Sequence, residues 1–297
     1  MKKKIIIFLV IFISIILFCL YYFQNKSAID NPSKETSINQ CEEKPIVNKT
    51  IIEETSKDTN IKDNMNFEGY ELKDNSEGVP VLYYHSIQKS GTNELMMDPN
   101  KFKSHLQWLK DNNYVTLTLN QLHDHLTNNT PIPKNSVVIT LDDGYIDNYI
   151  NALPIINEFG FNATVFMVSD FTGNENFLTE ETLRELDKNN IKVESHTSNH
   201  LNLPTLDKEN QNKEILNSKK SLEEILNRNV DYIAYPYGAY NEDTKNLAKE
   251  AGYKLGFSTD SGWANGNSPS YAIPRVYMSD FYDLDEFINR VTNPNYE

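Results

Sequence analysis

Short apolar runs alternate with amphipathic stretches from residue 79 to residue 291. Runs rich in Val, Ile, Tyr and Phe predict β-strands, because these side chains suit the pleated and buried surface of a sheet. Strands that alternate with helical patterns predict an α/β fold built on a parallel sheet. We predict strands at residues 79–84, 115–119, 136–141, 163–168, 191–194, 232–235 and 254–258.

Helical patterns occupy most of the gaps between these strands. The clearest begins at Asp98-Pro99, an N-cap residue followed by proline at the first helical position, and places Phe102, Leu106 and Leu109 on one face. So many strands suit a parallel sheet that curls into a barrel, and such sheets carry their active groups at the carboxyl ends of the strands. A second helix is predicted over residues 207–226, directing inward Ile215, Leu222, Ile225 and Leu226.

The chain begins with a basic and then strongly apolar segment. Lys2, Lys3 and Lys4 precede an uncharged run at residues 5–23, about the ~20 residues that a helix needs to cross a hydrocarbon core. We predict a membrane anchor whose basic flank stays in the cytoplasm, so that the rest of the chain faces outward. A cleaved signal peptide is the alternative, although its apolar region is usually shorter and ends at small residues.

Residues 24–77 are rich in Asn, Lys, Glu, Ser, Thr and Asp, with only scattered apolar pairs. Such a stretch cannot bury enough surface to offset its ordering entropy. It is predicted to be a flexible linker that lets an anchored domain, residues 78–297, reach outward into a cell wall. A poorly packed interaction segment is the alternative.

Composition narrows the classes of partner. The formal net charge of −14 argues against nucleic acid, whose phosphates require a basic face. The chain has two cysteines, Cys19 in the apolar run and Cys41 beyond it, so it has no disulfide framework. The domain must therefore be stabilised by an ordinary hydrophobic core, which its length can supply.

Two adjacent carboxylates end the strand predicted at residues 136–141. Asp142, Asp143 and Gly144 follow this apolar run directly. Because adjacent side chains point in different directions, one acid can bind a metal while the other meets substrate or water. An Asp-Gly turn with both acids in solvent would have the same sequence.

Two histidines follow the strand predicted at residues 191–194. His196 and His200 are four residues apart, so one helical turn would bring both imidazoles to one side as a metal clamp. A pair of surface or N-cap histidines is the alternative. Combined with a carboxylate from another strand end, the pair makes a two-His, one-carboxylate site with open positions for water and substrate.

A third strand exit reads Tyr235-Pro-Tyr-Gly238. A turn at this place could direct a backbone N–H toward a developing oxyanion. It could equally be an ordinary turn.

These motifs resemble those of a known family. Thr140-Leu-Asp-Asp-Gly144, His196-Thr-Ser-Asn-His200 and Tyr235-Pro-Tyr-Gly238, in this order and spacing, are similar to the successive motifs of the polysaccharide deacetylases of carbohydrate esterase family 4. The opening strand and its continuation, Val79-Pro-Val-Leu-Tyr-Tyr-His-Ser86, resemble the poly-N-acetylglucosamine deacetylase branch. The resemblance implies a distorted (β/α) barrel and a metal-dependent hydrolase that releases acetate from N-acetylated sugars.

The resemblance also implies residue roles. One zinc-like divalent ion would be held by Asp143, His196 and His200, and Asp142 would act as the general base. The backbone N–H of Tyr237 would join the ion in stabilising the oxyanion. An N-acetylated polysaccharide is the expected partner.

The chain departs from the broader family at two motifs. Ala234 stands where an arginine often precedes the Pro-Tyr-Gly turn, and Arg275 could replace that arginine beside Asp142. The late Asp-Ser-x-Asp-Trp motif is only loosely echoed by Thr259-Asp-Ser-Gly-Trp263, so Trp263 could line an acetyl pocket or belong to the core.

A general acid for the leaving amine follows from a count of histidines. Many family members take it from a late Leu-x-His motif, but the last histidine here is His200. His85 ends an apolar strand and so lies at the same end of the sheet as Asp142, and the branch resembled here also uses an early histidine. We assign the acid to His85, with a buried structural histidine as the alternative. Solvent or capping roles are expected for the others, His105, His123 and His125.

Other functions share parts of this pattern. A non-haem iron oxygenase also uses two histidines and one carboxylate, but neither the paired aspartates nor an exported location suits it. A wall-binding module with a degenerate site is a second alternative. Among substrates, peptidoglycan and poly-β-1,6-N-acetylglucosamine are favoured over acetylated xylan, an O-ester.

Overall fold

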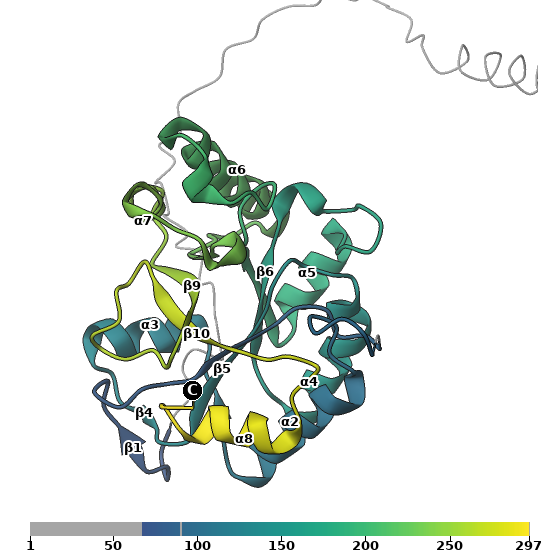
Figure 1. The fold of residues 1–297 in the computed structure, drawn as a ribbon, viewed down its shortest axis with the longest axis vertical. Helices are drawn as coiled ribbons and strands as arrows, with labels where there is room; N and C mark the ends of the chain where they lie inside the picture. The colour runs from purple at the N-terminus through teal and green to yellow at the C-terminus, as the bar shows by residue number, and fades with distance from the viewer. Residues whose placement is uncertain (1–66, 90, 297) are drawn as a thin grey trace, which may run out of the picture. The chain divides into compact units, whose positions relative to one another are not determined.

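Seven parallel strands close into a barrel in the computed structural model, which describes residues 67–89 and 91–296 (Figure 1). The ring runs β2-β10-β9-β8-β7-β6-β5 and closes by pairing of β5 with β2. The predicted parallel α/β barrel is therefore confirmed. The strands are β2 (Val81–Tyr84), β5 (Ser136–Leu141), β6 (Ala163–Met167), β7 (Ile191–Ser195), β8 (Tyr232–Ala234), β9 (Leu255–Ser261) and β10 (Ile273–Tyr277).

Two strand predictions need correction. The run at residues 115–119 forms only the two-residue strand β3 (Val115–Thr116), which pairs with the start of β5 outside the ring. The run stops early because Thr118 is the N-cap of helix α3 (Leu119–Asn128), in a reciprocal capping box with Gln121. Strand β10 was missed, since Pro274 and Arg275 interrupt its apolar pattern and its pairing with β9 shifts register there.

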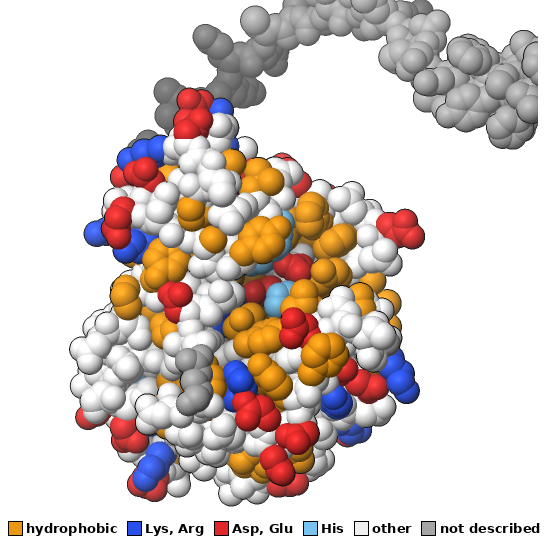
Figure 2. Space-filling model, in the orientation of Figure 1, with side chains coloured by type: hydrophobic (Ala, Val, Ile, Leu, Met, Phe, Trp, Pro, Cys, Tyr) orange, Lys and Arg blue, Asp and Glu red, His pale blue; other side chains and the backbone are white. Residues whose placement is uncertain are grey.

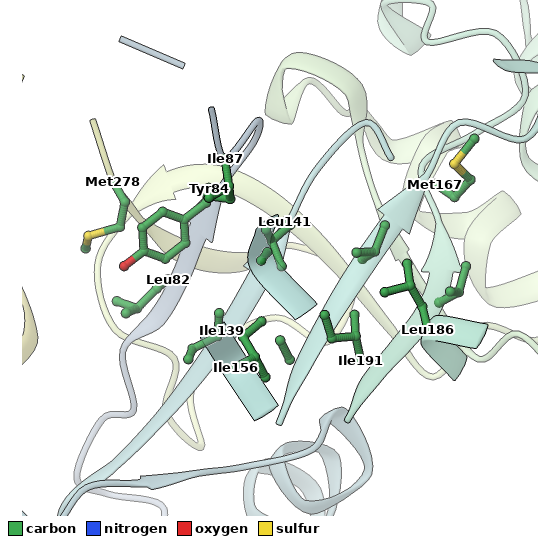
Figure 3. Packing of buried hydrophobic residues seen from close by; sticks show 14 of the residues in the cluster. Leu82, Tyr84, Ile87, Ile139, Leu141, Ile156, Met167, Leu186, Ile191 and Met278 are labelled. Atoms are coloured by element: carbon green, nitrogen blue, oxygen red, sulfur yellow. The ribbon is translucent and has the colours of Figure 1, made fainter. Parts of the chain in front are cut away.

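The barrel has two hydrophobic layers because its strand residues alternate in direction. One set of strand side chains, including Leu82, Ile139 and Leu141, packs outward against the helices (Figure 3). The other set, including Val138, Phe166 and Phe257, belongs to a second cluster that fills the barrel. The surrounding helices are α2 (Pro99–Asp111), α4 (Leu153–Phe159), α5 (Glu180–Lys188), α6 (Lys208–Leu226), α7 (Glu242–Glu250) and α8 (Leu284–Thr292).

The two helices singled out in the sequence are present. Asp98 caps α2 by accepting from the N–H of Asn100, with Pro99 at the first helical position, and Phe102, Leu106 and Leu109 are buried. Asp207 caps α6 in the same way, and its Ile215 and Leu222 are buried while Ile225 and Leu226 pack at the edge of the core. Local sequence signals therefore set both helix starts.

Residues just before the boundary predicted at residue 78 pair with the domain. Strand β1 (Leu72–Lys73) pairs antiparallel with β4 (Ile132–Pro133), which precedes β5. Lys73 is buried and its Nζ donates to the carbonyl of Gly78. The last part of the predicted linker thus packs on the domain. The Lys73 amine can be buried there because the Gly78 carbonyl accepts its hydrogen bond.

The predicted membrane anchor at residues 5–23 and the rest of the predicted linker lie outside the described residues. Within the part of the chain that the structure describes, no helix has the length and apolar character needed to cross a membrane.

Candidate active site

Three side chains from two strand exits converge at the carboxyl ends of the barrel strands. Asp143 follows β5, and His196 and His200 follow β7. The Nε2 atoms of both histidines lie 3.3 Å from Oδ1 of Asp143. His196 is fully enclosed, and its Nδ1–H donates to the carbonyl of Ala234 at 2.8 Å, because a carbonyl can only accept. This bond fixes the tautomer and leaves Nε2 with its lone pair toward Asp143.

The histidine segment is a loop and not the helical turn that the spacing predicted. Thr197 and His200 have φ values of 65° and 56°, in the left-handed region. Asp143 shares this feature, with φ at 74°. Non-glycine residues in this region cost about 1–3 kcal/mol each and cluster at functional sites. The loop brings both imidazoles to one point by irregular backbone, which a sequence spacing cannot reveal.

The three side chains fit a divalent metal ion. Their ligand atoms all lie within 4.8 Å of one another. Oδ1 of Asp143 is buried and has no hydrogen-bond partner among the described residues, since the two Nε2 atoms approach without the alignment of hydrogen bonds. Burial alone would raise the pKa of Asp143, but the facing imidazoles of His196 and His200 outweigh it and the net pKa is lowered. Two imidazoles and an ionised carboxylate suit zinc.

Asp142 faces the interior of the barrel and forms a buried ion pair. The guanidinium of Arg275 donates from Nη1 to Oδ1 of Asp142 at 2.8 Å and from Nη2 to Oδ2 at 2.7 Å. Asp142 is 2% exposed and Arg275 0%. Burial raises the pKa of Asp142, but the charge and hydrogen bonds of Arg275, together with the charges of His196 and His85, outweigh burial, so the net pKa lies below the usual range. The two aspartates therefore interact with different partners, Asp143 with two imidazoles and Asp142 with a guanidinium.

Arg275 is itself held in one orientation. Its Nε donates to the carbonyl of Ser258 at 2.8 Å, and its guanidinium lies 4.5 Å from the ring centroid of Tyr83. Arg275 on β10 thus contacts Asp142, as expected if it replaces the arginine that is absent at position 234. A planar guanidinium suits this two-oxygen contact better than a lysine ammonium would.

His85 follows β2 and lies beside the aspartates. Burial lowers the pKa of its imidazole, and the charges of Asp142 and Asp143 oppose this effect. Its Nδ1 is buried with no hydrogen-bond partner in the described part of the chain. Asn148 fixes the backbone at this point by donating to the carbonyl of His85 at 2.9 Å. One ring nitrogen of His85 is therefore left without a hydrogen bond to the described part of the chain.

The turn after β8 completes the cluster. Tyr237 lies in the short helix η4 (Pro236–Gly238) with φ at 60°, and its ring centroid is 4.7 Å from that of His200. The N–H groups of Gly238 and Ala239 form the hydrogen bonds that close the turn. The N–H of Tyr237 lies in the first residues of this short helix, where backbone N–H groups have no acceptor within the helix. Gly238 is required because a Cβ there would lie 2.0 Å from Oγ1 of Thr259.

Comparison with known proteins identifies the family of this chain. The sequence profile of the family described as polysaccharide deacetylase matches residues 129–256, which contain the two aspartates and both histidines. YxkH, a candidate polysaccharide deacetylase of Bacillus subtilis (strain 168), is 39% identical over 201 residues, covering 68% of this chain and 71% of that protein. The chain belongs to the polysaccharide deacetylase family. This membership confirms the expected enzyme class, a hydrolase acting on carbon–nitrogen bonds other than peptide bonds.

Two further relatives of this deacetylase are informative. A poly-β-1,6-N-acetyl-D-glucosamine N-deacetylase of Staphylococcus aureus is 32% identical over 216 residues, covering 67% of this chain and 73% of that protein. The deacetylase PplD of Streptococcus pyogenes, solved with acetate, superimposes with a TM-score of 0.70 at 29% identity, over 72% of this chain and 98% of that one. The barrel is therefore of the deacetylase type.

The remaining histidines lie outside the site of the deacetylase, and two of them are buried. His105 is buried, stacked on Phe287 at 4.0 Å between ring centroids, and its Nδ1 is 3.1 Å from the hydroxyl of Tyr84. His125 is also buried and donates from Nδ1 to the carbonyl of Thr130 at 2.8 Å. His105 therefore serves packing, where a solvent or capping role was expected, whereas the bond of His125 at the end of α3 agrees with the expected capping role.

Trp263 also has a structural role. Its indole Nε1 donates to the carbonyl of Arg290 at 3.0 Å, and a Cβ on Gly78 would lie 2.8 Å from its side chain. The alternative that assigned Trp263 to the core is therefore favoured over a place in an acetyl pocket.

An aromatic pair that the sequence motifs did not predict lies beside the candidate metal site. Tyr145, two residues after Asp143, stacks on Phe177 with 5.2 Å between ring centroids. The position of Tyr145 directly after the Asp-Asp-Gly turn was the sequence signal that could have indicated this pair. Figure 2 shows the result, with histidines in pale blue and carboxylates in red inside a hollow bordered by hydrophobic side chains in orange.

Proposed function

We propose that this deacetylase hydrolyses the N-acetyl groups of N-acetylglucosamine units in an envelope polysaccharide, using one divalent ion held by Asp143, His196 and His200. The observation that carries the proposal is the division of labour between two adjacent aspartates. Asp143 faces two imidazoles, while Asp142 is paired separately with Arg275. One carboxylate is thus placed to bind the ion and the other to move a proton.

The ion, when bound, would polarise the acetyl carbonyl and lower the pKa of a water molecule. Asp142 accepts a proton from the attacking water, and Arg275 keeps that carboxylate ionised at neutral pH. The water oxygen bonds to the acetyl carbon, and the N–H of Tyr237 donates to the oxyanion. His85 then gives a proton to the nitrogen as the C–N bond breaks. Acetate and a free amino sugar leave, and no covalent enzyme intermediate is needed.

The polymer is proposed from the relatives and the opening strand. The Staphylococcus aureus relative is named for poly-β-1,6-N-acetyl-D-glucosamine, and the segment from Val79 to Ser86 resembles the same branch. This polymer is our first candidate and peptidoglycan the second. Acetylated xylan, an O-ester substrate, is the third.

We further propose that the domain works outside the cell, on the wall side of the membrane. The support is the basic and apolar N-terminal sequence, residues 2–23, followed by a polar linker. Cleavage of that segment would give a secreted enzyme with the same orientation.

A panel of polymers tests the proposed activity. Acetate release is measured on poly-β-1,6-N-acetylglucosamine, peptidoglycan and acetylated xylan, with protein that is metal-replete, chelated or chelated and then given Zn²⁺. We expect release from an N-acetylated polymer that stops on chelation and returns with Zn²⁺. Absence of release from all three polymers, with polymer still bound, would instead identify a binding module with a degenerate site.

A further inference from the structure

The loop that carries the two candidate histidine ligands has an unfavourable backbone conformation. Thr197 and His200 both lie in the left-handed region, where a β-branched residue such as threonine is rare. Residues keep this conformation only when the surrounding structure imposes it. The contacts that hold residues 196–200 therefore determine where the imidazole of His200 lies.

The segment after strand β6 holds the first half of this loop. The N–H of Ser169 donates to the carbonyl of Thr197 at 3.1 Å. The N–H of Asp170 donates to the carbonyl of Ser198 at 3.0 Å. These two backbone bonds end at Ser198, so the second half of the loop depends on contacts from another element.

Helix α6 holds the second half of the loop through Glu214. This helix packs on β7 and on the short helix η2 (Ser169–Phe171). The carboxylate of Glu214 accepts from the backbone N–H of Asn199 at 2.8 Å and from Nδ2 of the same residue at 3.1 Å. The main-chain carbonyl of Glu214 accepts from the N–H of Ser198 at 3.1 Å and from its hydroxyl at 3.3 Å. One residue of α6 thus accepts four hydrogen bonds from the two residues that precede His200.

Helix packing alone does not explain the burial of Glu214. Its residue is 7% exposed, and among the described residues no lysine, arginine or histidine forms an ion pair with it; the adjacent Lys213 pairs with Glu209 instead. A buried carboxylate without a cation costs free energy unless hydrogen-bond donors satisfy it. A position that only packed the helix would favour an apolar side chain. The carboxylate is therefore better explained by the loop that it holds.

We propose that Glu214 is a positioning residue that holds the imidazole of His200 at the metal site through the backbone of Asn199. His200 follows Asn199 directly, so the backbone that Glu214 holds sets where this imidazole lies. His196 is fixed separately, by the bond from its Nδ1 to the carbonyl of Ala234. The inference rests on the metal site of the proposed function and adds how that site is kept formed before an ion binds.

The zinc affinity of the folded protein tests this role without substrate. Chelated protein is titrated with Zn²⁺ against a chromophoric chelator at neutral pH, for the wild type, Glu214→Ala and Glu214→Gln. Partners that orient metal ligands typically contribute 10- to 100-fold to metal affinity, so we expect Glu214→Ala to weaken zinc binding by about 10- to 100-fold. Glu214→Gln keeps one oxygen to accept from the N–H of Asn199 and should therefore lose less.

Three comparisons separate positioning from a general loss of stability. Glu224→Gln, at an exposed glutamate of the same helix, should bind zinc like the wild type. Ile215→Val removes buried apolar volume beside Glu214, so it should lower the urea midpoint without changing zinc affinity. In a His200→Ala background, Glu214→Ala should weaken the residual zinc binding by less than about 2-fold, because two residues that act through one ligand are not additive.

Equal zinc affinity of the wild type and Glu214→Ala, with circular dichroism unchanged, would overturn the positioning role. A full further loss in the His200→Ala background would overturn it as well. A wild type that binds no zinc would overturn the metal site and this inference with it, whereas zinc binding without acetate release would reject the proposed activity alone. If Glu214→Ala is unfolded, Glu214→Gln decides, with weaker zinc binding as the expected result and unchanged binding as the contradictory one.

Discussion

Removal of the Arg275 guanidinium is the most informative perturbation of the proposed base. Arg275→Ala leaves the carboxylate of Asp142 buried, with neither of its two contacts at 2.7 and 2.8 Å. Breaking one half of a buried ion pair costs about 3–5 kcal/mol, since the remaining charge is uncompensated. Against a typical stability of about 5–15 kcal/mol, the variant should remain folded but unfold at clearly lower urea concentration.

The pH dependence of this loss follows from the pKa of Asp142. In the wild type the folded pKa lies below its ordinary value, so the carboxylate adds stability above about pH 4 that is lost as pH falls through the lowered pKa. Without Arg275, only the charges of His196 and His85 oppose burial, and we expect burial to raise the folded pKa above the ordinary value. The Asp142 carboxylate then destabilises the fold near pH 7, and this penalty shrinks as pH falls.

The assay combines urea unfolding with the pH–rate profile of acetate release. We expect Arg275→Ala to move the acidic limb of the profile to higher pH, with Arg275→Lys in between because it keeps the charge but not the planar fork. The double variant Arg275→Ala, Asp142→Asn should recover part of the lost stability, since a neutral amide replaces the unpaired charge. An unmoved acidic limb, or no recovery in the double variant, would refute the reasoning and leave Arg275 as a packing residue.

Other substitutions separate the remaining roles. His200→Ala should lose most bound zinc by elemental analysis while circular dichroism is unchanged, and full occupancy would remove His200 from the site. Asp142→Asn should keep the metal and lose ~100- to 10,000-fold in kcat, as expected for a general base; loss of metal would exchange its role with that of Asp143. His85→Ala should bind metal normally and deacetylate amides slowly, yet largely spare an aryl acetate whose leaving group needs no proton, and equal losses on both substrates would contradict the acid assignment.

Most barrel strands could be predicted from local sequence because their apolar runs end at polar residues. The run at residues 136–141 coincides with β5, since Asp142 stops it. Strand β10 could not be found in this way, because its central residue is a charged side chain. Arg275 is compatible with the interior only through Asp142, which lies 133 residues earlier. No local sequence pattern can indicate an ion-pair partner so far away along the chain.

The convergence of three candidate side chains could be predicted, but their geometry could not. The order of Asp143, His196 and His200 at strand exits was sufficient to group them, because parallel strands end at one edge. The left-handed backbone of Thr197 and His200 is imposed by tertiary contacts, so the expected helical turn was wrong. The stacking of Tyr145 on a residue 32 positions away is likewise a property of the fold, given by the antiparallel bridge to Phe177.

The most direct test of the central claim is simultaneous measurement of zinc content and acetate release during titration of chelated protein with Zn²⁺, using poly-β-1,6-N-acetylglucosamine as substrate. The proposed site predicts that activity rises in proportion to bound zinc and reaches its plateau at one ion per chain. His196→Ala, measured alongside, should neither bind the ion tightly nor release acetate. Full activity in the chelated wild type, or a plateau that His196→Ala also reaches, would contradict a metal site formed by Asp143, His196 and His200.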